Sequence, residues 1–487
     1  MGLLRKPDFQ RETNHWTPEQ IASLITSFLD NELVPSIILW KSKRYIFVID
    51  GSHRLSAVRA WIENDYGDGS ISRGFYGWEI TQAQIVQAKR SREIVENKVG
   101  RFEDYEQALT KNTYASPEQQ RRAGRLFTRG LTLQWVQGSA SAAETSFFKI
   151  NSQGTPLDTV EETLLRHRRK PVAIAARAIV RAGTGNKYWS AFTGDHQRRI
   201  EQIASELSNL LFRADPQQPV RSIDVPLGGS ASASDALSLL IDLLIIADTA
   251  SAKSTLDASQ KAIGNSYSDD LDGKKTVAVL EKALRLTRRF TGNEAASLGL
   301  HPAVYFYNDR GRHSRFLFLG MALLLAEKLK NNDTGFFQKF TRVRGSLENL
   351  LIEQKTVIMA VVSNTNKNTR VNRVRDLLDK FVGAMHAQLH ENKEFNLENV
   401  LREVGIQGKI LDVSMMKTKE KIDEDTKIAI VFQESLRAAA KCPICEGLLL
   451  PSQSVSFDHK LRVREGGLGS IENSQMVHPF CNTGVKS

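Results

Sequence analysis

The sequence predicts a multidomain α+β protein, and three observations support this prediction. The 487 residues suffice for about three domains, and 41% hydrophobic with 25% charged residues is an ordinary globular composition. Strand-like and helix-like apolar patterns alternate before residue 165, whereas helical spacing dominates residues 172–435. All three cysteines lie between residues 442 and 481. We therefore expect an α/β domain at 1–165, a mostly helical domain at 166–435 and a small metal-stapled module at 436–487.

The first domain begins with short elements that local patterns identify. Thr17 is a good N-cap and Pro18 suits the first helical position, so we expect a helix over 17–30. Two short apolar segments, 35–39 and 45–49, predict a β-hairpin. Further helices are expected at 55–61, 85–98 and 116–127, followed by a strand at 131–136.

The predicted hairpin ends in Asp50-Gly51, directly before a helix. Such a junction suits a phosphate, because glycine lets the backbone approach closely and the free amides of the first helical turn point outward. Arg54 would add a fork of donors. The same residues also fit a plain strand-to-helix connection with a solvent-exposed arginine, which the local pattern alone favours.

Three segments carry a resemblance to a known family. Asp50-Gly51-Ser52-His53-Arg54-Leu55 resembles the Asp-Gly-Gln-Gln-Arg-Leu signature of the ParB-like N-terminal domain of GmrSD-type restriction enzymes. Gln10-Arg11 with Trp16 resembles the opening element of that domain, and residues 147–157 resemble its Phe-x-x-Ile-Asn-x-x-Gly-x-Pro-Leu element. The resemblance implies a ParB-like α/β fold that binds a nucleoside triphosphate. In this chain Ser52 and His53 replace the two glutamines of the signature. The resemblance therefore implies binding of a nucleoside triphosphate more directly than it implies NTPase activity. The implied nucleotide-binding residues are Gln10, Arg11, Asp50, Gly51, Ser52, His53, Arg54 and Asn151.

The middle of the chain is predicted to be helical. The densest basic run, 166–171, fits a helix C-terminus followed by proline. It equally fits a DNA-contacting edge in which Arg168 and Arg169 bind phosphates, and the net charge of +11 permits a polyanionic partner. Residues 226–235 and 254–272 are predicted to be loops. Helices are expected at 173–182, 199–212, 236–250, 276–290, 316–329 and 371–386.

Two ligand pairs frame the terminal module. Cys442/Cys445 and His478/Cys481 each have two intervening residues, the spacing by which one tight turn brings two ligands to the same zinc ion. Three cysteines in so long a chain argue against a disulfide framework. Because a module of about fifty residues buries little apolar surface, we expect Zn²⁺ to supply much of its folding energy.

Further polar residues lie between and after these pairs. Asp458-His459 is followed by a Gly-Gly pair and Asn473, and Asn482 comes directly after the last cysteine. This order resembles the zinc-stapled form of the HNH endonuclease family, which has a ββα-metal fold. The chain departs from that form at His478, where the family usually has a cysteine. Imidazole is an ordinary zinc ligand, so a zinc site is still expected.

The HNH resemblance implies a role for each of these residues. His459 would be the general base, since imidazole accepts a proton near neutral pH. Asn473 would hold the hairpin loop, and Asp458 and Asn482 would bind a catalytic ion. Their oxygen ligands favour Mg²⁺ or Mn²⁺. Lys486 falls where the family contacts a DNA phosphate.

These features predict a metal-dependent DNA endonuclease of a bacterial restriction or anti-phage defence type. Its HNH site would be controlled by the ParB-like domain, which senses a nucleotide or a DNA modification. The expected partners are DNA, including modified phage DNA, and a nucleoside triphosphate; the sequence is also compatible with a homo-oligomer. The start lacks a signal-like apolar segment and no apolar run approaches about 18 residues, so we expect a cytoplasmic protein without a membrane partner. The alternative is a non-catalytic DNA- or partner-binding regulator with a zinc knuckle, because a knuckle needs only the two ligand pairs.

Overall fold

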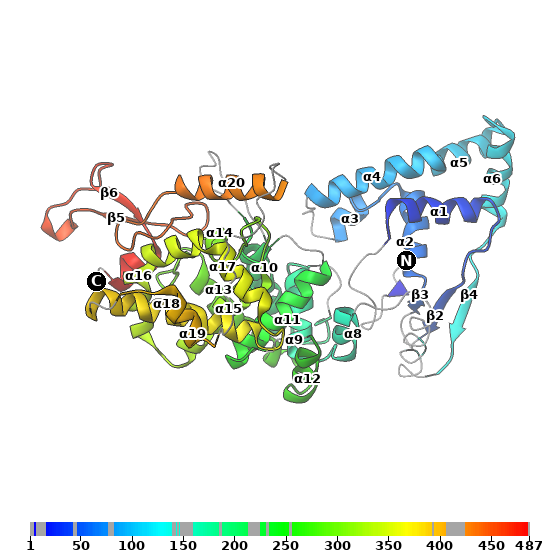
Figure 1. Ribbon diagram of the computed structural model, residues 1–487. Helices are drawn as coiled ribbons and strands as arrows, with labels where there is room; N and C mark the ends of the chain where they lie inside the picture. Colours follow the sequence, from blue (N-terminus) through cyan, green and yellow to red (C-terminus); the bar gives the residue numbers. More distant parts are fainter. Residues whose placement is uncertain are drawn as a thin grey trace. The chain divides into compact units, whose positions relative to one another are not determined.

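The protein is α-rich, with few strands, and separates into two compact units (Figure 1). Unit 1 comprises Met1–Arg168 and Thr184–Asn186, and unit 2 comprises Arg169–Gly183 and Lys187–Ser487. No helix among the described residues is both long and apolar enough to cross a bilayer. The computed structural model of the chain describes residues 4–5, 16–41, 46–75, 82–138, 143, 146, 159–184, 188–212, 225–229, 233–252, 256–391, 394–405 and 424–485.

Unit 1 contains a four-stranded sheet in the order β1-β3-β2-β4. Strands β2 and β3 pair antiparallel, which confirms the predicted hairpin, while β1 pairs with β3 and β4 with β2 in parallel. Ile37, Leu39 and Val48 are buried and form one apolar cluster of the sheet. The strands are β1 (Leu4–Arg5), β2 (Ile37–Lys41), β3 (Ile46–Asp50) and β4 (Leu133–Val136).

The first helix of unit 1 begins where its local signals predict. In α1 (Pro18–Leu29), the Thr17 hydroxyl accepts a hydrogen bond from Gln20 N at 3.3 Å, and the Gln20 side chain accepts one from Thr17 N at 2.8 Å. This capping box satisfies two of the free amides of the first turn. The remaining described helices are α2 (Ser52–Glu63), α3 (Ser70–Phe75), α4 (Gln82–Lys98), α5 (Phe102–Lys111), α6 (Pro117–Thr128) and α8 (Thr159–Arg166). Of these, α3, α5 and α8 were not predicted.

Unit 2 is built from packed helices, and the six helices predicted for the middle of the chain are confirmed. One loop prediction, 254–272, is wrong because α12 occupies part of it. That helix carries few apolar residues and is held by a tertiary contact: the buried Ser259 hydroxyl donates to Asp242 on α11 at 2.6 Å. The helices of this unit are α9 (Pro171–Val180), α10 (Gly194–Phe212), α11 (Ala233–Thr249), α12 (Leu256–Ser266), α13 (Lys274–Phe290), α14 (Pro302–Tyr305), α15 (Arg315–Lys330), α16 (Thr334–Glu353), α17 (Lys355–Asn364), α18 (Arg370–Glu391), α19 (Leu397–Glu403) and α20 (Glu424–Arg437).

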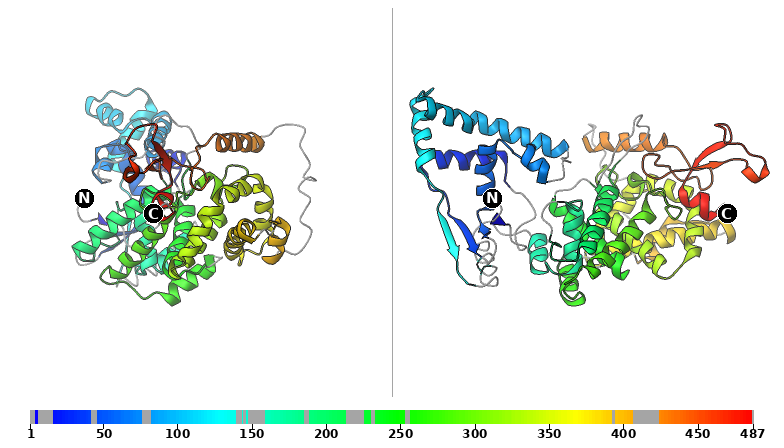
Figure 2. Two further views of the ribbon diagram at one scale, coloured as in Figure 1. Left: turned by 90° about the vertical axis from the view of Figure 1, so that its left-hand side faces the viewer. Right: turned by 180° about the vertical axis from the view of Figure 1, so that it is seen from behind.

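The end of the chain forms a small hairpin within unit 2. Strands β5 (Ser456–His459) and β6 (Ser474–Val477) pair antiparallel, with the short 3-10 helix η2 (Val463–Glu465) in the connecting loop. A helical segment, η3 (Cys481–Val485), follows. In Figure 1 and the right-hand view of Figure 2, the hairpin extends away from the helices of unit 2.

Candidate functional site

The two predicted ligand pairs come together at the base of the hairpin. One ligand atom from each of Cys442, Cys445, His478 and Cys481 lies within 4.8 Å of the other three, and all four residues are buried. Three sulfurs and one imidazole nitrogen form a donor set that suits tetrahedral zinc. The structure therefore confirms a buried Cys3His group that can hold a metal ion.

The orientation of His478 fits this role. Its Nδ1 lies 3.3 Å from Cys445 Sγ, whereas its Nε2 lies 3.0 Å from the carbonyl oxygen of Leu448. A proton on Nε2 therefore donates to the backbone and leaves Nδ1 as the ligating atom. Burial lowers the pKa of His478, which favours the neutral imidazole that binds metal. Hydrogen bonds among the thiols lower the pKa of Cys442 and raise the pKa values of Cys445 and Cys481, so without metal the three sulfurs favour one thiolate stabilised by two thiols.

A buried ion pair on α16 holds the metal-binding turns. Arg344 Nε lies 2.7 Å from Glu348 Oε1, and both side chains are 2% exposed. The other oxygen of Glu348 accepts a hydrogen bond from Leu448 N at 2.6 Å, and Tyr305 OH donates to Oε1 at 2.9 Å. Next to this pair, Gly345 N donates to the carbonyl oxygen of Cys445 at 3.0 Å. The first ligand pair is thus fixed to a helix about one hundred residues upstream by charged and backbone hydrogen bonds.

The segment after α13 holds the start of the hairpin and the second ligand pair. Ser454 Oγ donates to the carbonyl oxygen of Gly292 at 2.6 Å, and Val455 N donates to Asn293 Oδ1 at 3.0 Å. Phe480 N donates to the carbonyl oxygen of Ser297 at 2.9 Å. The base of the hairpin is therefore anchored both to α16 and to the segment after α13.

Asp458 and Asn482 belong to the same face of the hairpin. Asp458 pairs with Gln475 across the strands, and Gln475 Nε2 donates to Asp458 Oδ2 at 3.1 Å. Two residues earlier, Ser456 Oγ accepts from Asn482 Nδ2 at 2.8 Å. Since residues two apart share a face of a strand, the carboxylate and the amide group lie on one side. The amide nitrogen of Asn482 is engaged with Ser456, so its oxygen is the atom suited to bind a cation.

His459 lies on the opposite face of β5, because side chains alternate along a strand. Its Nε2 is next to Gly469, where an added Cβ would lie 3.8 Å away. Asn473 holds the loop that carries this glycine: its amide donates to the carbonyl oxygens of Leu461 and Leu468 at 3.1 and 2.8 Å, and its Oδ1 accepts from Leu461 N at 2.7 Å. The loop around His459 is therefore fixed by one asparagine side chain.

The predicted nucleotide site of unit 1 lies at the junction of β3 and α2. Gly51 is the N-cap with φ of 90°, a conformation that favours glycine. Arg54 folds back over it and donates to Asp50 Oδ2 at 2.6 Å and to the carbonyl oxygen of Ser36 at 3.1 Å. His53 stacks with Trp16 at a ring-centroid distance of 5.9 Å. Ser52 is the first residue of α2, so these residues surround one helix N-terminus.

The remaining predicted residues divide into two groups. Arg168 and Arg169 lie in the turn between α8 and α9, where Pro171 occupies the first turn of α9. This arrangement matches a helix end followed by proline, and the backbone oxygen of Arg169 accepts from Asp270 N at 2.9 Å. Contact with DNA stays a prediction. Gln10, Arg11, Asn151 and Lys486 lie outside the described residues.

Sequence reasoning missed the residues that orient or anchor the site. Gln475 could have been found only from the strand register that pairs it with Asp458. Arg344 and Glu348 are four residues apart on a helix, which normally indicates a solvent-exposed pair. No local signal distinguishes such a pair from the buried one seen here.

Comparison with known proteins identifies the N-terminal part of the chain. Residues 2–167 match the family model of the GmrSD restriction endonuclease, N-terminal domain. This match confirms the GmrSD-type resemblance for that segment and supports a restriction or defence nuclease. No curated protein and no solved structure matches the chain.

Proposed function

We propose that this protein is a metal-dependent DNA endonuclease of a bacterial restriction or defence type, in which the terminal hairpin is an HNH site. The observation that carries the proposal is the arrangement of the hairpin. Asp458 and Asn482 share one face, His459 projects beside a loop that Asn473 fixes, and a Cys3His group closes the base. The match of residues 2–167 to the N-terminal domain of the GmrSD restriction endonuclease supports the same activity.

Hydrolysis requires that water attack phosphorus while the bond to the leaving oxygen breaks. In this proposal His459 is the base that removes the proton from this water; it is partly exposed at the last position of β5, on the face opposite Asp458. Asp458 and Asn482 supply the oxygen atoms that would hold Mg²⁺ or Mn²⁺, while Gln475 keeps the Asp458 carboxylate in place. A bound divalent ion stabilises the negative charge that develops on the phosphate.

Plasmid cleavage with Mg²⁺ or Mn²⁺ tests this function. His459→Ala should reduce the cleavage rate at least about 100-fold, because a positioned general base contributes that much or more. His390→Ala, which removes an exposed imidazole from α18, is the matched control and should cut at the wild-type rate. Equal cleavage by both variants would exclude His459 as the base.

The control domain is the second part of the proposal. The turn at Gly51, the Arg54 guanidinium and the stacked His53 and Trp16 rings surround the N-terminus of α2, which is an environment suited to a phosphate. Isothermal titration with CTP, GTP, UTP and ATP would detect binding, and Arg54→Ala should abolish it while leaving the zinc content unchanged. If none of the four nucleotides binds, the domain does not sense a nucleotide.

A non-catalytic regulator with a zinc knuckle is the competing function, and the buried docking of the Cys3His group on α16 favours it. Such a regulator needs only tightly held zinc, whereas the nuclease also needs an exchangeable divalent ion. Elemental analysis combined with Mn²⁺ titration distinguishes the two. Zinc without any Mn²⁺ binding would favour the regulator.

A further inference from the structure

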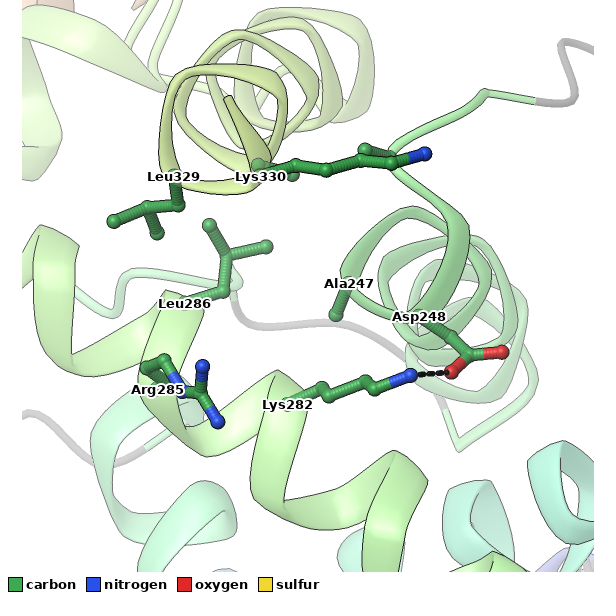
Figure 3. A pocket seen from close by; sticks show the side chains of 9 residues that line it. Ala247, Asp248, Lys282, Arg285, Leu286, Leu329 and Lys330 are labelled. Carbon is green, nitrogen blue, oxygen red and sulfur yellow. Dashed lines mark hydrogen bonds and ion pairs between the residues drawn. The ribbon is translucent and has the colours of Figure 1, made fainter. Parts of the chain in front are cut away.

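A hollow lined by basic side chains opens between three helices of unit 2. Its volume is about 320 Å³, and it lies between the C-terminal ends of α11 and α15 and the middle of α13. Ala247, Leu286 and Leu329 line its apolar part. Figure 3 shows Lys282 and Arg285 extending from α13, while Lys330 reaches across from α15 toward the end of α11. We call this hollow the basic pocket.

The charge of the basic pocket favours an anion. Its lining has three cationic side chains, Lys282, Arg285 and Lys330, and one carboxylate, Asp248, which leaves a net charge of +2 (3 − 1). The carboxylate is already engaged, since Lys282 Nζ lies 2.7 Å from it and Tyr267 OH donates to it at 2.9 Å. Asp248 therefore offsets one cation and leaves the positive charge of the other two.

The basic pocket also has donors to spare. Among the described residues, Arg285 has neither a hydrogen-bond nor an ion-pair partner, and its guanidinium has five N–H groups. Lys330 Nζ makes one hydrogen bond, to the carbonyl oxygen of Thr249 at 3.2 Å, and an ammonium has three donors. Unused donors from two helices thus surround one small volume.

Stabilisation of helix ends explains only part of this arrangement. Lys330 lies at the end of α15 and satisfies the last turn of α11, as expected for a cation at a helix C-terminus. Lys282 and Arg285 lie in the middle of α13, where the helix dipole gives no reason for a cation. The ion pair with Asp248 accounts for the position of Lys282, whereas Arg285 has no such partner among the described residues.

We propose that the basic pocket binds a phosphate ester, with the phosphate on Arg285, Lys282 and Lys330 and the attached organic group against Ala247, Leu286 and Leu329. Arginine provides a forked pair of donors that matches two phosphate oxygens, and the lysines add point charges. The phosphate ester comes from a free nucleotide or from the backbone of a DNA strand. This site is independent of the proposed nuclease and of the Asp50–Arg54 junction.

Isothermal titration of the full-length chain tests the proposal, using inorganic phosphate, AMP and a short DNA oligonucleotide without terminal phosphates. The Arg54→Ala chain serves as the parent, so that the junction in unit 1 does not contribute. Adding Arg285→Ala should weaken binding about tenfold, the factor expected for one charge-assisted hydrogen bond at an exposed site. Adding Lys274→Ala instead, on the exposed first turn of α13, removes the same charge outside the basic pocket and should leave binding unchanged.

The three probes distinguish the source of the phosphate. Weaker binding of phosphate and AMP supports a free nucleotide, whereas weaker binding of the oligonucleotide alone supports a DNA backbone. Thermal melting confirms that the variants are folded. If Arg285→Ala binds all three probes as the parent does, or if Lys274→Ala weakens binding equally, the basic pocket is not a phosphate site. Plasmid cleavage, measured separately, reports on the nuclease alone.

Discussion

The most informative perturbation is Glu348→Ala, which removes the acceptor at the centre of the buried network on α16. Arg344 would keep its charge in a fully buried position, and both Tyr305 OH and Leu448 N would lose an acceptor. Removing one partner of a buried ion pair costs ~3–5 kcal/mol, and the two orphaned donors place this variant at the upper end. For a unit of this size, we expect the melting temperature to fall by about 10 °C.

The pH dependence gives a second signature of the same network. Burial raises the pKa of Glu348, but the charge of Arg344 and the hydrogen bond from Leu448 N outweigh it, so the pKa is lowered from its ordinary value of 4.5. A lowered pKa stabilises the folded state above the unfolded pKa, and this stabilisation is lost as the pH falls through the folded value. The difference between wild type and Glu348→Ala should therefore be constant from neutral pH down to about 5 and shrink below about 4.

Calorimetry at several pH values measures the stability of each variant, and elemental analysis measures its zinc content. Tyr305→Phe removes one donor and leaves the ion pair intact, so it should lower stability by only ~1–2 kcal/mol. Glu348→Gln keeps an acceptor but not the charge, which separates hydrogen bonding from ion pairing. If Glu348→Ala retains zinc and melts within about one degree of wild type, the network does not hold the metal-binding turns.

Three further changes, the first with a matched control, probe the hairpin. Gly467→Ala would place a Cβ 1.9 Å from a backbone oxygen of the same loop, so it should reduce the cleavage rate at least about tenfold. Gly469→Ala is the control, because its Cβ would make only an ordinary 3.8 Å contact and should be tolerated. Similar cleavage rates for the two variants would contradict this prediction. Gln475→Leu removes the hydrogen bond to Asp458 and should weaken Mn²⁺ binding about tenfold. Electron paramagnetic resonance measures this affinity, and an unchanged value would show that Gln475 does not position the carboxylate. Cys481→Ala should abolish zinc binding and lower the melting temperature, and elemental analysis showing a full complement of zinc would remove this residue from the ligand set.

The contrast between α1 and α12 shows what the sequence could predict. Thr17, Pro18 and Gln20 specify the start of α1 by contacts within four residues, so its beginning follows from the sequence. Helix α12 has a weak apolar pattern and depends on Ser259 meeting Asp242 of another helix, a contact that no local pattern reveals. Local chemistry predicted the elements with short-range signals, whereas elements that depend on tertiary contacts were missed.

In the candidate site, too, the features set by local contacts were predictable and those set by tertiary contacts were not. The spacing of Cys442, Cys445, His478 and Cys481 predicted the metal-binding group, because a ligand pair in a tight turn is a local feature. Its attachment to α16 was not predictable, since it depends on where a helix from the middle of the chain is placed. For the same reason, nothing in the sequence indicated the backbone hydrogen bonds that join the terminal segment, predicted as a module at 436–487, to α16 and to the segment after α13.

This attachment explains how a hairpin can be both exposed and well positioned. In the proposed nuclease, Asp458, His459 and Asn482 must reach a phosphate backbone and so cannot be buried. A hairpin of two four-residue strands is too small to be rigid alone. Here the metal-binding group, Glu348 and the segment after α13 fix its base, while the polar side chains toward the loop stay partly exposed. Positioning to within about 1 Å decides the rate of such chemistry. In the proposed nuclease, the burial of charge on α16 would therefore contribute to the orientation of the hairpin as well as to stability.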